Sequence, residues 1–181
     1  MLLYFSVTNN ILSGSLPTEL GSLGSLTSLG VCTNQIIRTV PTEFRKLTSL
    51  VLISATDNKL TGPLPSELGY LTSLSFLTLS ENILTHRIPT EIGRLTQLAQ
   101  FLANTNKLSG SIPTKIGNLT NLQSIFLDGN YLSGIIPKQV ANLTNLLYFY
   151  ISSNNMTGHL PSELQIMTKL SVLAVVEYTT K

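Results

Sequence analysis

LTSLSFLTLSENILTHRIPTEIGR, residues 71–94, is one unit of a pattern that runs along the chain without insertion or deletion. Its asparagine, Asn82, recurs every 24 residues, and a proline such as Pro89 follows each asparagine by seven positions. The asparagines are Asn10, Asn34, Asn58, Asn82, Asn106, Asn130 and Asn154. A period this strict predicts stacked, nearly identical units instead of one globular core.

Apolar residues occupy fixed positions around each asparagine. In the quoted unit they are Leu71, Leu74, Leu77, Leu79 and Leu84. The pair five and three positions before the asparagine alternates with polar or variable residues, which is strand periodicity. One unit cannot bury its apolar face alone, but stacked units share a continuous core. We therefore expect a parallel sheet of about eight strands, one from each unit.

The asparagine lies just past the predicted strand, where the chain must bend inward. Its amide both donates and accepts hydrogen bonds, so it can satisfy backbone groups in the bend and in the adjacent unit. Each such buried bond contributes about 1 kcal/mol net. The column of seven asparagines is therefore interpreted as a structural ladder and not as a binding site.

The second half of each unit reads Gly-x-hydrophobic-Pro-Ser/Thr-Glu. Proline followed by an acidic residue is typical of the first turn of a short helix, where the missing N–H costs nothing and the helix dipole favours a negative charge. A glycine often comes next, and we expect it to mark the end of the helix. These glycines are Gly21, Gly69, Gly93 and Gly117.

The pattern Asn-x-Leu-Ser/Thr-Gly-x-Ile/Leu-Pro-x-Glu-Leu/Ile-Gly resembles the plant-type leucine-rich repeat. Asn10–Gly21, Asn58–Gly69 and Asn106–Gly117 carry it best, and the resemblance covers essentially all 181 residues. It implies a right-handed α/β solenoid in the form of a horseshoe arc. The parallel sheet would line the concave face, and short helical or 3-10 segments the convex face. Family members include ectodomains of receptor-like kinases, receptor-like proteins and polygalacturonase-inhibiting proteins.

Residues 1–181 are expected to form a single leucine-rich-repeat domain of seven 24-residue repeats and a partial eighth, with both ends uncapped. Arg38 and His86 replace the glycine that usually follows the asparagine by four positions, and Tyr178 replaces the eighth asparagine. Caps in the family usually hold paired cysteines, whereas Cys32 is the only cysteine here. We therefore expect a fragment of a longer protein, or a short solenoid whose ends self-associate with a second copy.

Composition and motifs argue against catalysis and against several classes of partner. Charged residues make up 11% of the chain and the net charge is +2, so no bulk charge favours nucleic acid. No apolar run is long enough for a membrane span. His86 and His159 lie in different repeats, and no cluster has metal-ligand or triad spacing. The sequence predicts a protein that is not an enzyme and uses no cofactor or metal.

The residues six, four, two and one positions before each asparagine should form the concave surface. This selection contains no Lys or Arg, although the chain has eleven. It does contain Asp57, Glu81, Asp128 and Glu177. An acidic face without counter-charge favours neutral or basic ligands over polyanions.

An apolar column crosses the same predicted surface through Leu102, Phe126 and Tyr150. Exposed apolar side chains on adjacent strands usually mark a contact surface. The alternative is that cross-strand aromatic pairs only stabilise the sheet, or that the rest of a longer protein covers them. The candidate ligand-binding residues are Phe76, Leu102, Phe126, Asp128, Tyr148, Tyr150, Ser152, Asp57 and Glu81.

The leading hypothesis is a recognition module of a receptor-like or secreted protein that binds a protein or peptide on the concave face. The alternatives are an intracellular scaffold and an inhibitor of a secreted wall-degrading enzyme. Three sequons, at Asn118, Asn142 and Asn155, are candidate N-glycosylation sites, although the repeat consensus produces such sequons automatically. The family resemblance implies an extracellular or cell-surface location, with a cytoplasmic one as the alternative.

Overall fold

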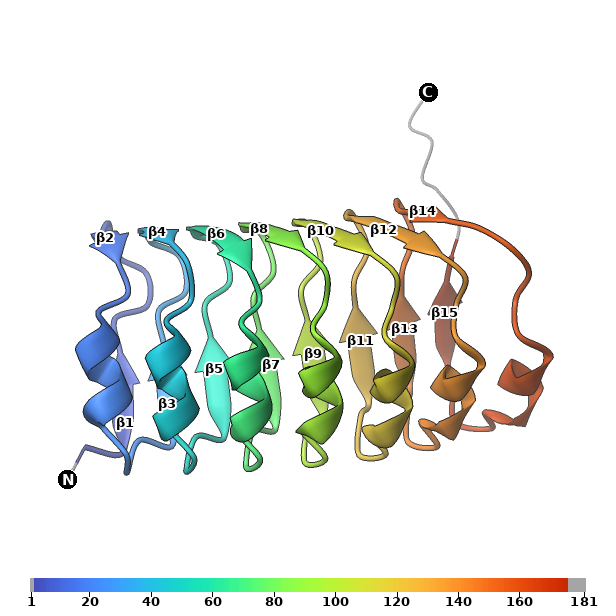
Figure 1. Cartoon of the computed structure of the whole chain (residues 1–181), viewed down its shortest axis with the longest axis horizontal. Helices are drawn as coiled ribbons and strands as arrows, with labels where there is room; N and C mark the ends of the chain where they lie inside the picture. Colours follow the sequence, from blue (N-terminus) through green and yellow to red (C-terminus); the bar gives the residue numbers. More distant parts are fainter. Residues whose placement is uncertain (1, 176–181) are drawn as a thin grey trace.

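The computed structural model describes residues 2–175 as a solenoid of stacked turns (Figure 1). Each turn contributes a strand to one sheet, a strand to a second sheet and a short 3-10 helix. The two sheets and the row of helices run side by side along the long axis of the molecule (Figure 1). Glu177 and Tyr178, which the sequence placed in the eighth repeat, lie outside the described residues.

The concave sheet has eight parallel strands in simple sequential order, as predicted. Its strands are β1 (Tyr4–Ser6), β3 (Ser28–Gly30), β5 (Leu52–Ser54), β7 (Phe76–Thr78), β9 (Gln100–Leu102), β11 (Ser124–Phe126), β13 (Tyr148–Tyr150) and β15 (Val172–Ala174). Each residue pairs with the residue 24 positions away, as Phe126 does with Tyr150. Equivalent positions of successive repeats therefore stand side by side across this sheet.

A second parallel sheet of seven strands, which the sequence did not predict, follows the asparagines. Its strands are β2 (Ser13–Ser15), β4 (Gln35–Arg38), β6 (Lys59–Pro63), β8 (Ile83–His86), β10 (Lys107–Gly110), β12 (Tyr131–Gly134) and β14 (Asn155–Met156). In this sheet Lys107 pairs with Thr85, 22 positions away, so the strands slant relative to the repeat.

The 3-10 helices form the third column of the solenoid, and each begins directly after the repeat proline. They are η1 (Thr18–Ser22), η2 (Thr42–Lys46), η3 (Ser66–Tyr70), η4 (Thr90–Arg94), η5 (Thr114–Asn118), η6 (Lys138–Asn142) and η7 (Ser162–Ile166). Pro89, for example, precedes η4 with φ −67° and ψ 142°. Proline is pre-organised at this φ, so it fixes the entry into the helix.

The glycines near the helix ends have a different role from the one expected. Gly93 lies inside η4 and does not adopt the left-handed backbone of a helix C-terminus. A Cβ on Gly93 would lie 2.5 Å from the carbonyl oxygen of Lys115 in the next turn. Gly21, Gly69 and Gly117 make the same close approach. The prediction that these glycines end the helix was therefore wrong, because they let neighbouring helices approach each other.

The leucines of the repeat form one continuous core between the two sheets and the helices. Leu71, Leu74, Leu77 and Leu84 are fully buried, as the pattern predicted.

The last described turn packs more loosely than the others. Leu160 is 55% exposed, whereas Ile136 at the same position of the preceding repeat is 4% exposed. An apolar hollow of about 700 Å³, lined in part by Ile112, Ile135 and Leu160, opens beside it. The segment between β14 and η7 swings wide of the other turns in Figure 1. The core is therefore tightest in the middle repeats.

The repeat asparagine joins each turn to the one before it. The amide nitrogen of Asn82 donates to the carbonyl oxygens of Leu79 and Ser80 in its own bend, both at 3.1 Å. It also donates to Ala55 of the preceding turn at 2.9 Å, and its oxygen accepts from the Leu60 N–H at 2.9 Å. The same four bonds recur at Asn34, Asn58, Asn106, Asn130 and Asn154.

Arg38 and His86 adopt the left-handed backbone, with φ of 69° and 67°. The same position in other repeats is held by Gly62, Gly110 and Gly134, with φ between 73° and 78°. A side chain in this conformation costs about 1–2 kcal/mol relative to glycine. Arg38 and His86, the two departures from the repeat pattern, therefore introduce local backbone strain.

We expect Asn82→Ala to lower the free energy of unfolding by about 3 kcal/mol, because it leaves buried backbone groups without partners. The matched control is Asn10→Ala, since exposed Asn10 bonds only to Val7 and Thr8 of its own turn. That change should lower the free energy of unfolding by less than about 1 kcal/mol. Urea unfolding of the two variants measures the difference, and equal losses would contradict the role of the asparagine between turns.

We expect Arg38→Gly and His86→Gly each to raise the free energy of unfolding by about 1 kcal/mol, because glycine relieves the left-handed strain. The reverse change, Gly134→Arg, should destabilise the protein by a similar amount. Thermal melts of the three variants check the prediction. A loss of stability in both glycine variants would show that the two side chains make contacts that outweigh the strain.

Candidate ligand-binding face

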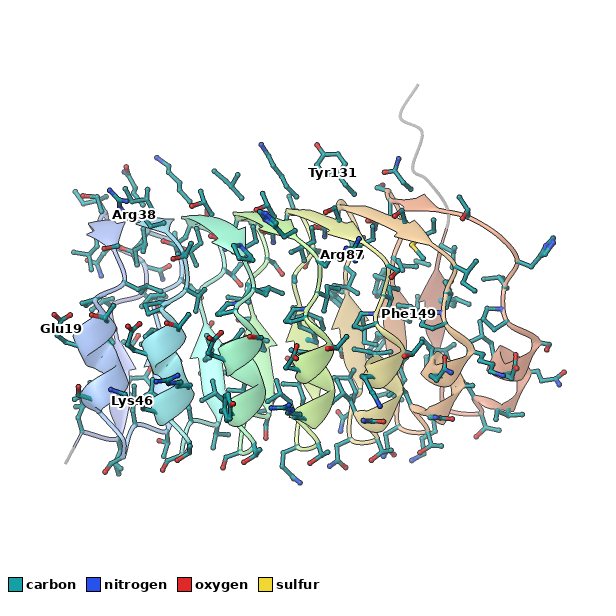
Figure 2. All side chains as sticks on the ribbon, viewed as in Figure 1. Glu19, Arg38, Lys46, Arg87, Tyr131 and Phe149 are labelled. Atoms are coloured by element: carbon teal, nitrogen blue, oxygen red, sulfur yellow. The ribbon has the colours of Figure 1, made fainter. Side chains whose placement is uncertain are left out.

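The outward surface of the concave sheet comes from the first and third residues of each strand. The middle residue points into the core, so Ile125 and Phe149 are buried while Phe126 and Tyr150 remain partly exposed. Figure 2 labels Phe149 among the side chains enclosed between the sheet and the helices. The alternation predicted from the sequence is therefore the one that builds this face.

Four apolar side chains gather on the C-terminal half of this face. Phe126 lies between Leu102 and Tyr150 on adjacent strands, and Tyr148 occupies the same strand as Tyr150. The rings of Phe126 and Tyr150 meet edge to face, with centroids 4.7 Å apart and planes at 71°. We call Leu102, Phe126, Tyr148 and Tyr150 the aromatic patch.

The side chains of the aromatic patch stabilise the sheet and also remain accessible at its surface. An edge-to-face pair contributes about 0.5–1.5 kcal/mol beyond its burial, so Phe126 and Tyr150 do stabilise the sheet. Tyr148 is nevertheless 40% exposed, and the other three side chains are only half-buried. The pairing therefore orients the rings without removing them from the surface.

The structure does not bring every candidate residue to this patch. Phe76 is exposed on β7, but Gln100 and Ser124 separate it from Tyr148 along the same row of the sheet. Ser152 follows Tyr150 on the same face, yet it is only 7% exposed. Its hydroxyl makes no side-chain hydrogen bond among the described residues and is not a fully buried oxygen, so Ser152 remains a candidate.

The acidic candidates fall into two groups. Asp128 lies two residues beyond Phe126 and is half-buried beside the aromatic patch. Asp57 and Glu81 are exposed in the turns that lead out of the sheet, each with a left-handed backbone (φ 56° and 53°). They belong to repeats on the N-terminal side of the patch. Only Asp128 therefore contributes its charge directly to the patch.

Burial raises the pKa of the Asp128 carboxyl above its ordinary value of 3.8, and a hydrogen bond from its own backbone offsets part of this rise. The charged form is therefore disfavoured at this site in the folded protein. A cationic group on a ligand would restore the lost stabilisation of that charge.

Polar side chains in the N-terminal half of the face hydrogen-bond to one another. Ser54 Oγ lies 2.8 Å from Cys32 Sγ and accepts from Thr78 Oγ1 at 3.1 Å. The Ser80 hydroxyl likewise donates a hydrogen bond to Asn104 Oδ1 of the next repeat. Sequence reasoning missed this network because the repeat pattern shows which residues are neighbours but not which polar atoms come within hydrogen-bonding distance. Tyr4 and Phe76 on this half are also exposed, so the aromatic patch is distinguished by a row of apolar side chains on three adjacent strands and not by being the only apolar surface of the face.

The comparisons with known proteins agree with the geometry. A family model described as Leucine Rich Repeat matches residues 121–143 and 145–167. The structure of the plant peptide hormone receptor RGFR1 in complex with RGF2 superposes on 90% of this chain with a TM-score of 0.89 and 36% identity. The chain is a plant-type leucine-rich-repeat protein.

Two other solved receptors resemble this leucine-rich-repeat protein closely. The Arabidopsis receptor kinase HAESA, solved with the peptide hormone IDA and the co-receptor SERK1, superposes on 97% of the chain with a TM-score of 0.94 and 31% identity. A TDR receptor superposes on 91% with a TM-score of 0.89 and 36% identity. The chain spans only 26% to 29% of the length of these three receptor chains. No curated protein sequence matches it.

Other features of the leucine-rich-repeat chain lie away from the aromatic patch. The sequon residues Asn118 and Asn142 are exposed at the ends of η5 and η6, and Asn155 is exposed at the start of β14. Across residues 2–175, no group of three or more His, Cys, Asp or Glu residues could hold a metal ion. None of the helices in that range is long and apolar enough to cross a membrane.

We expect Asp128→Asn to raise the melting temperature at pH 7 but not at pH 3. Because the folded-state pKa is raised, the carboxylate destabilises the fold once the pH rises above the unfolded-state value of 3.8. Below that value both states are protonated and the penalty vanishes. Melts across pH 3 to 7 measure the effect, with Asp57→Asn as the control at an exposed carboxylate. An equal rise in melting temperature at pH 3 would contradict the explanation that burial of the carboxylate destabilises the fold.

Proposed function

We propose that the chain is a non-catalytic recognition module of a receptor-like or secreted leucine-rich-repeat protein, and that it binds a peptide or protein on its concave face. The observation that carries this proposal is the aromatic patch on β9, β11 and β13. Partly exposed aromatic side chains, held in place by each other, are the kind of residue that dominates binding energy in protein interfaces.

The position of the patch suits an extended peptide. Leu102, Phe126 and Tyr150 stand in one row across three adjacent strands, about 4.8 Å apart from strand to strand. A peptide that crosses the strands would meet one apolar side chain per strand, and it would pass Asp128 at one edge of the row. The rings lose little conformational entropy on binding because they are already packed.

Charge narrows the class of ligand. The residues that the sequence assigned to the concave surface include no Lys or Arg, and Asp128 lies two residues beyond Phe126. A half-buried carboxylate with a raised pKa favours a neutral or basic ligand and disfavours an acidic one. The solved relatives support a peptide, because RGFR1 was solved with RGF2 and HAESA with the peptide hormone IDA.

The same relatives support an extracellular or cell-surface location, since HAESA is a receptor kinase with a peptide hormone ligand. Under this proposal Asn118, Asn142 and Asn155 are candidate glycosylation sites. Treatment of the native protein with a glycosidase would then lower its mass. An unchanged mass would instead favour the intracellular scaffold.

We expect Phe126→Ala combined with Tyr150→Ala to weaken peptide binding about thirtyfold or more, because interface residues of this type contribute about 2 kcal/mol or more. The measurement is retention of secreted peptides on the immobilised chain, with the retained peptides identified by mass spectrometry and their affinity then measured singly.

The matched control is Tyr70→Ala combined with Tyr131→Ala, which removes two exposed aromatic rings from other faces. Tyr148→Ser provides a milder variant, because Tyr148 is not part of the ring pair and its loss should leave the fold intact. Unchanged retention in both patch variants would contradict the proposal. If binding of a partner instead depended on Asp57 and Glu81 and weakened steeply with salt, the result would favour the alternative that the chain inhibits an enzyme with a basic surface.

A further inference from the structure

The apolar hollow beside the last described turn is formed by three successive turns of the solenoid. Its walls come from the segments that lead from the second sheet into η5, η6 and η7. The buried side chains of Ile112 and Ile136 form its floor, while Ile135 and Leu160 are exposed at its sides. None of these segments belongs to the concave sheet. The hollow therefore lies between turns and away from the aromatic patch.

The hollow opens where the second sheet ends early. The last strand, β14, has two residues, whereas β12 beside it has four. The Thr157 N–H still donates to the carbonyl oxygen of Gly134 at 2.8 Å, and beyond this bond the chain swings wide on its way to η7 (Figure 1). A Cβ on Gly158 would lie 2.7 Å from Ile135 Cγ2. Ile135 is thus held against the backbone of the next turn, at the edge of the opening.

Three residues of the turn that leads into η6 depart from the repeat pattern, and all three line the hollow. Ile135 is apolar where the adjacent repeats have Ser111 and His159. Lys138 is a cation where the other helices begin with Ser or Thr, and Gln139 is neutral where η1 to η4 and η7 carry Glu. Residues that stacking alone requires recur in each repeat. Departures that gather at one place, and that make it more apolar and more positive, therefore indicate a local function.

The rim of the hollow offers a cation to a ligand. Lys138 is exposed there, and so is His159. Glu163 is the one acidic residue in the described walls, and its carboxylate accepts a hydrogen bond from the Ser162 hydroxyl of its own helix at 3.3 Å. A negative charge on a ligand that lies in the hollow can therefore pair with the Lys138 ammonium.

From these features we propose that the hollow binds a small amphiphile with an apolar chain or ring system and a single carboxylate, as in a fatty acid. Its volume of about 700 Å³ is that of a small-molecule site, and such sites combine apolar walls with a few polar groups. The apolar part would lie on Ile112, Ile135 and Leu160, and the carboxylate would pair with Lys138. This binding is separate from the peptide binding proposed for the concave face and does not depend on it.

The surroundings of the hollow favour a small molecule over a protein partner. A stable protein interface covers about 800 Å² on each side and has an apolar centre. Here the side chains that border the apolar hollow on the helices are polar and exposed, as at Thr114, Lys138 and Ser162. The apolar surface is therefore confined to the hollow itself.

The test uses two variants that insert the residue of the preceding repeat. They are Ile135→Ser, after Ser111, and Lys138→Thr, after Thr114. Both side chains are exposed, so the fold should be kept. The matched controls are Ile37→Ser and Lys107→Thr, which remove an exposed isoleucine and an exposed lysine from the second sheet.

The probe is laurate below its micelle concentration, with dodecanol as the neutral comparator and dodecyltrimethylammonium as the cationic one. Isothermal titration calorimetry measures the affinity. Methyl NMR spectra of the natural chain locate the site, and melting curves of each variant check that the fold is kept.

We expect laurate to bind the natural chain and to shift the methyl signals of Ile112, Ile135 and Leu160. The methyl signals of Leu102 in the aromatic patch should not move. Ile135→Ser should weaken laurate binding about tenfold, because it removes an apolar wall. Lys138→Thr should weaken laurate binding about fivefold and leave dodecanol binding unchanged, because only a carboxylate pairs with the ammonium. The two control variants should bind laurate as the natural chain does.

Several results would overturn the proposal. They are failure of laurate to bind, methyl shifts at the aromatic patch instead of the hollow, equal losses in the hollow and control variants, and equal effects of Lys138→Thr on laurate and dodecanol. Tighter binding of a leucine-rich peptide than of laurate in the hollow would assign it to a protein segment, which also contradicts the proposal. The peptide-binding proposal is tested at Phe126 and Tyr150 on the other sheet, so it stands or falls separately.

Discussion

The architecture depends on one amide group per turn. The asparagine side chain satisfies carbonyl groups in its own bend, and it reaches back to one carbonyl and one N–H of the preceding turn. Neighbouring turns are thereby fixed at the same offset throughout, which gives the concave sheet its regular register. The backbone of each bend is satisfied mainly by this one residue. The outward positions of both sheets are therefore free to differ from repeat to repeat.

The sequence predicts the parts of the fold that depend on one side chain per turn. The buried leucines, the asparagines and the prolines all have their expected places. The second sheet was missed because its strands contain or end at residues with positive φ, such as Gly110, and because their register is offset by 22 residues instead of 24. Glycines such as Gly93 were misinterpreted because the atoms that leave no room for a side chain there belong to a neighbouring turn. For the same reason the burial of Ser152 could not be read from its own repeat.

The surface divides the solenoid into regions of different chemistry. On the concave face, a hydrogen-bonded network around Ser54 gives way to the aromatic patch around Phe126. The exposed acidic side chains Asp57 and Glu81 lie in the turns that lead out of that face. Sequence spacing alone located the aromatic column and placed Phe76 in the neighbouring column, and the sheet register agrees with both.

The close approach of the helices at the repeat glycines also sets how strongly the solenoid bends. Curvature is the difference in spacing between the sheet side and the helix side of a stack. The glycines keep the helix side narrow, whereas Arg45 and Ala141 occupy the same position in η2 and η6. A larger residue there keeps neighbouring helices further apart, and because hydrogen bonds fix the strand spacing on the opposite face, it increases the difference between the two sides. The radius of the ligand-binding face is thus adjustable by residues that no ligand touches.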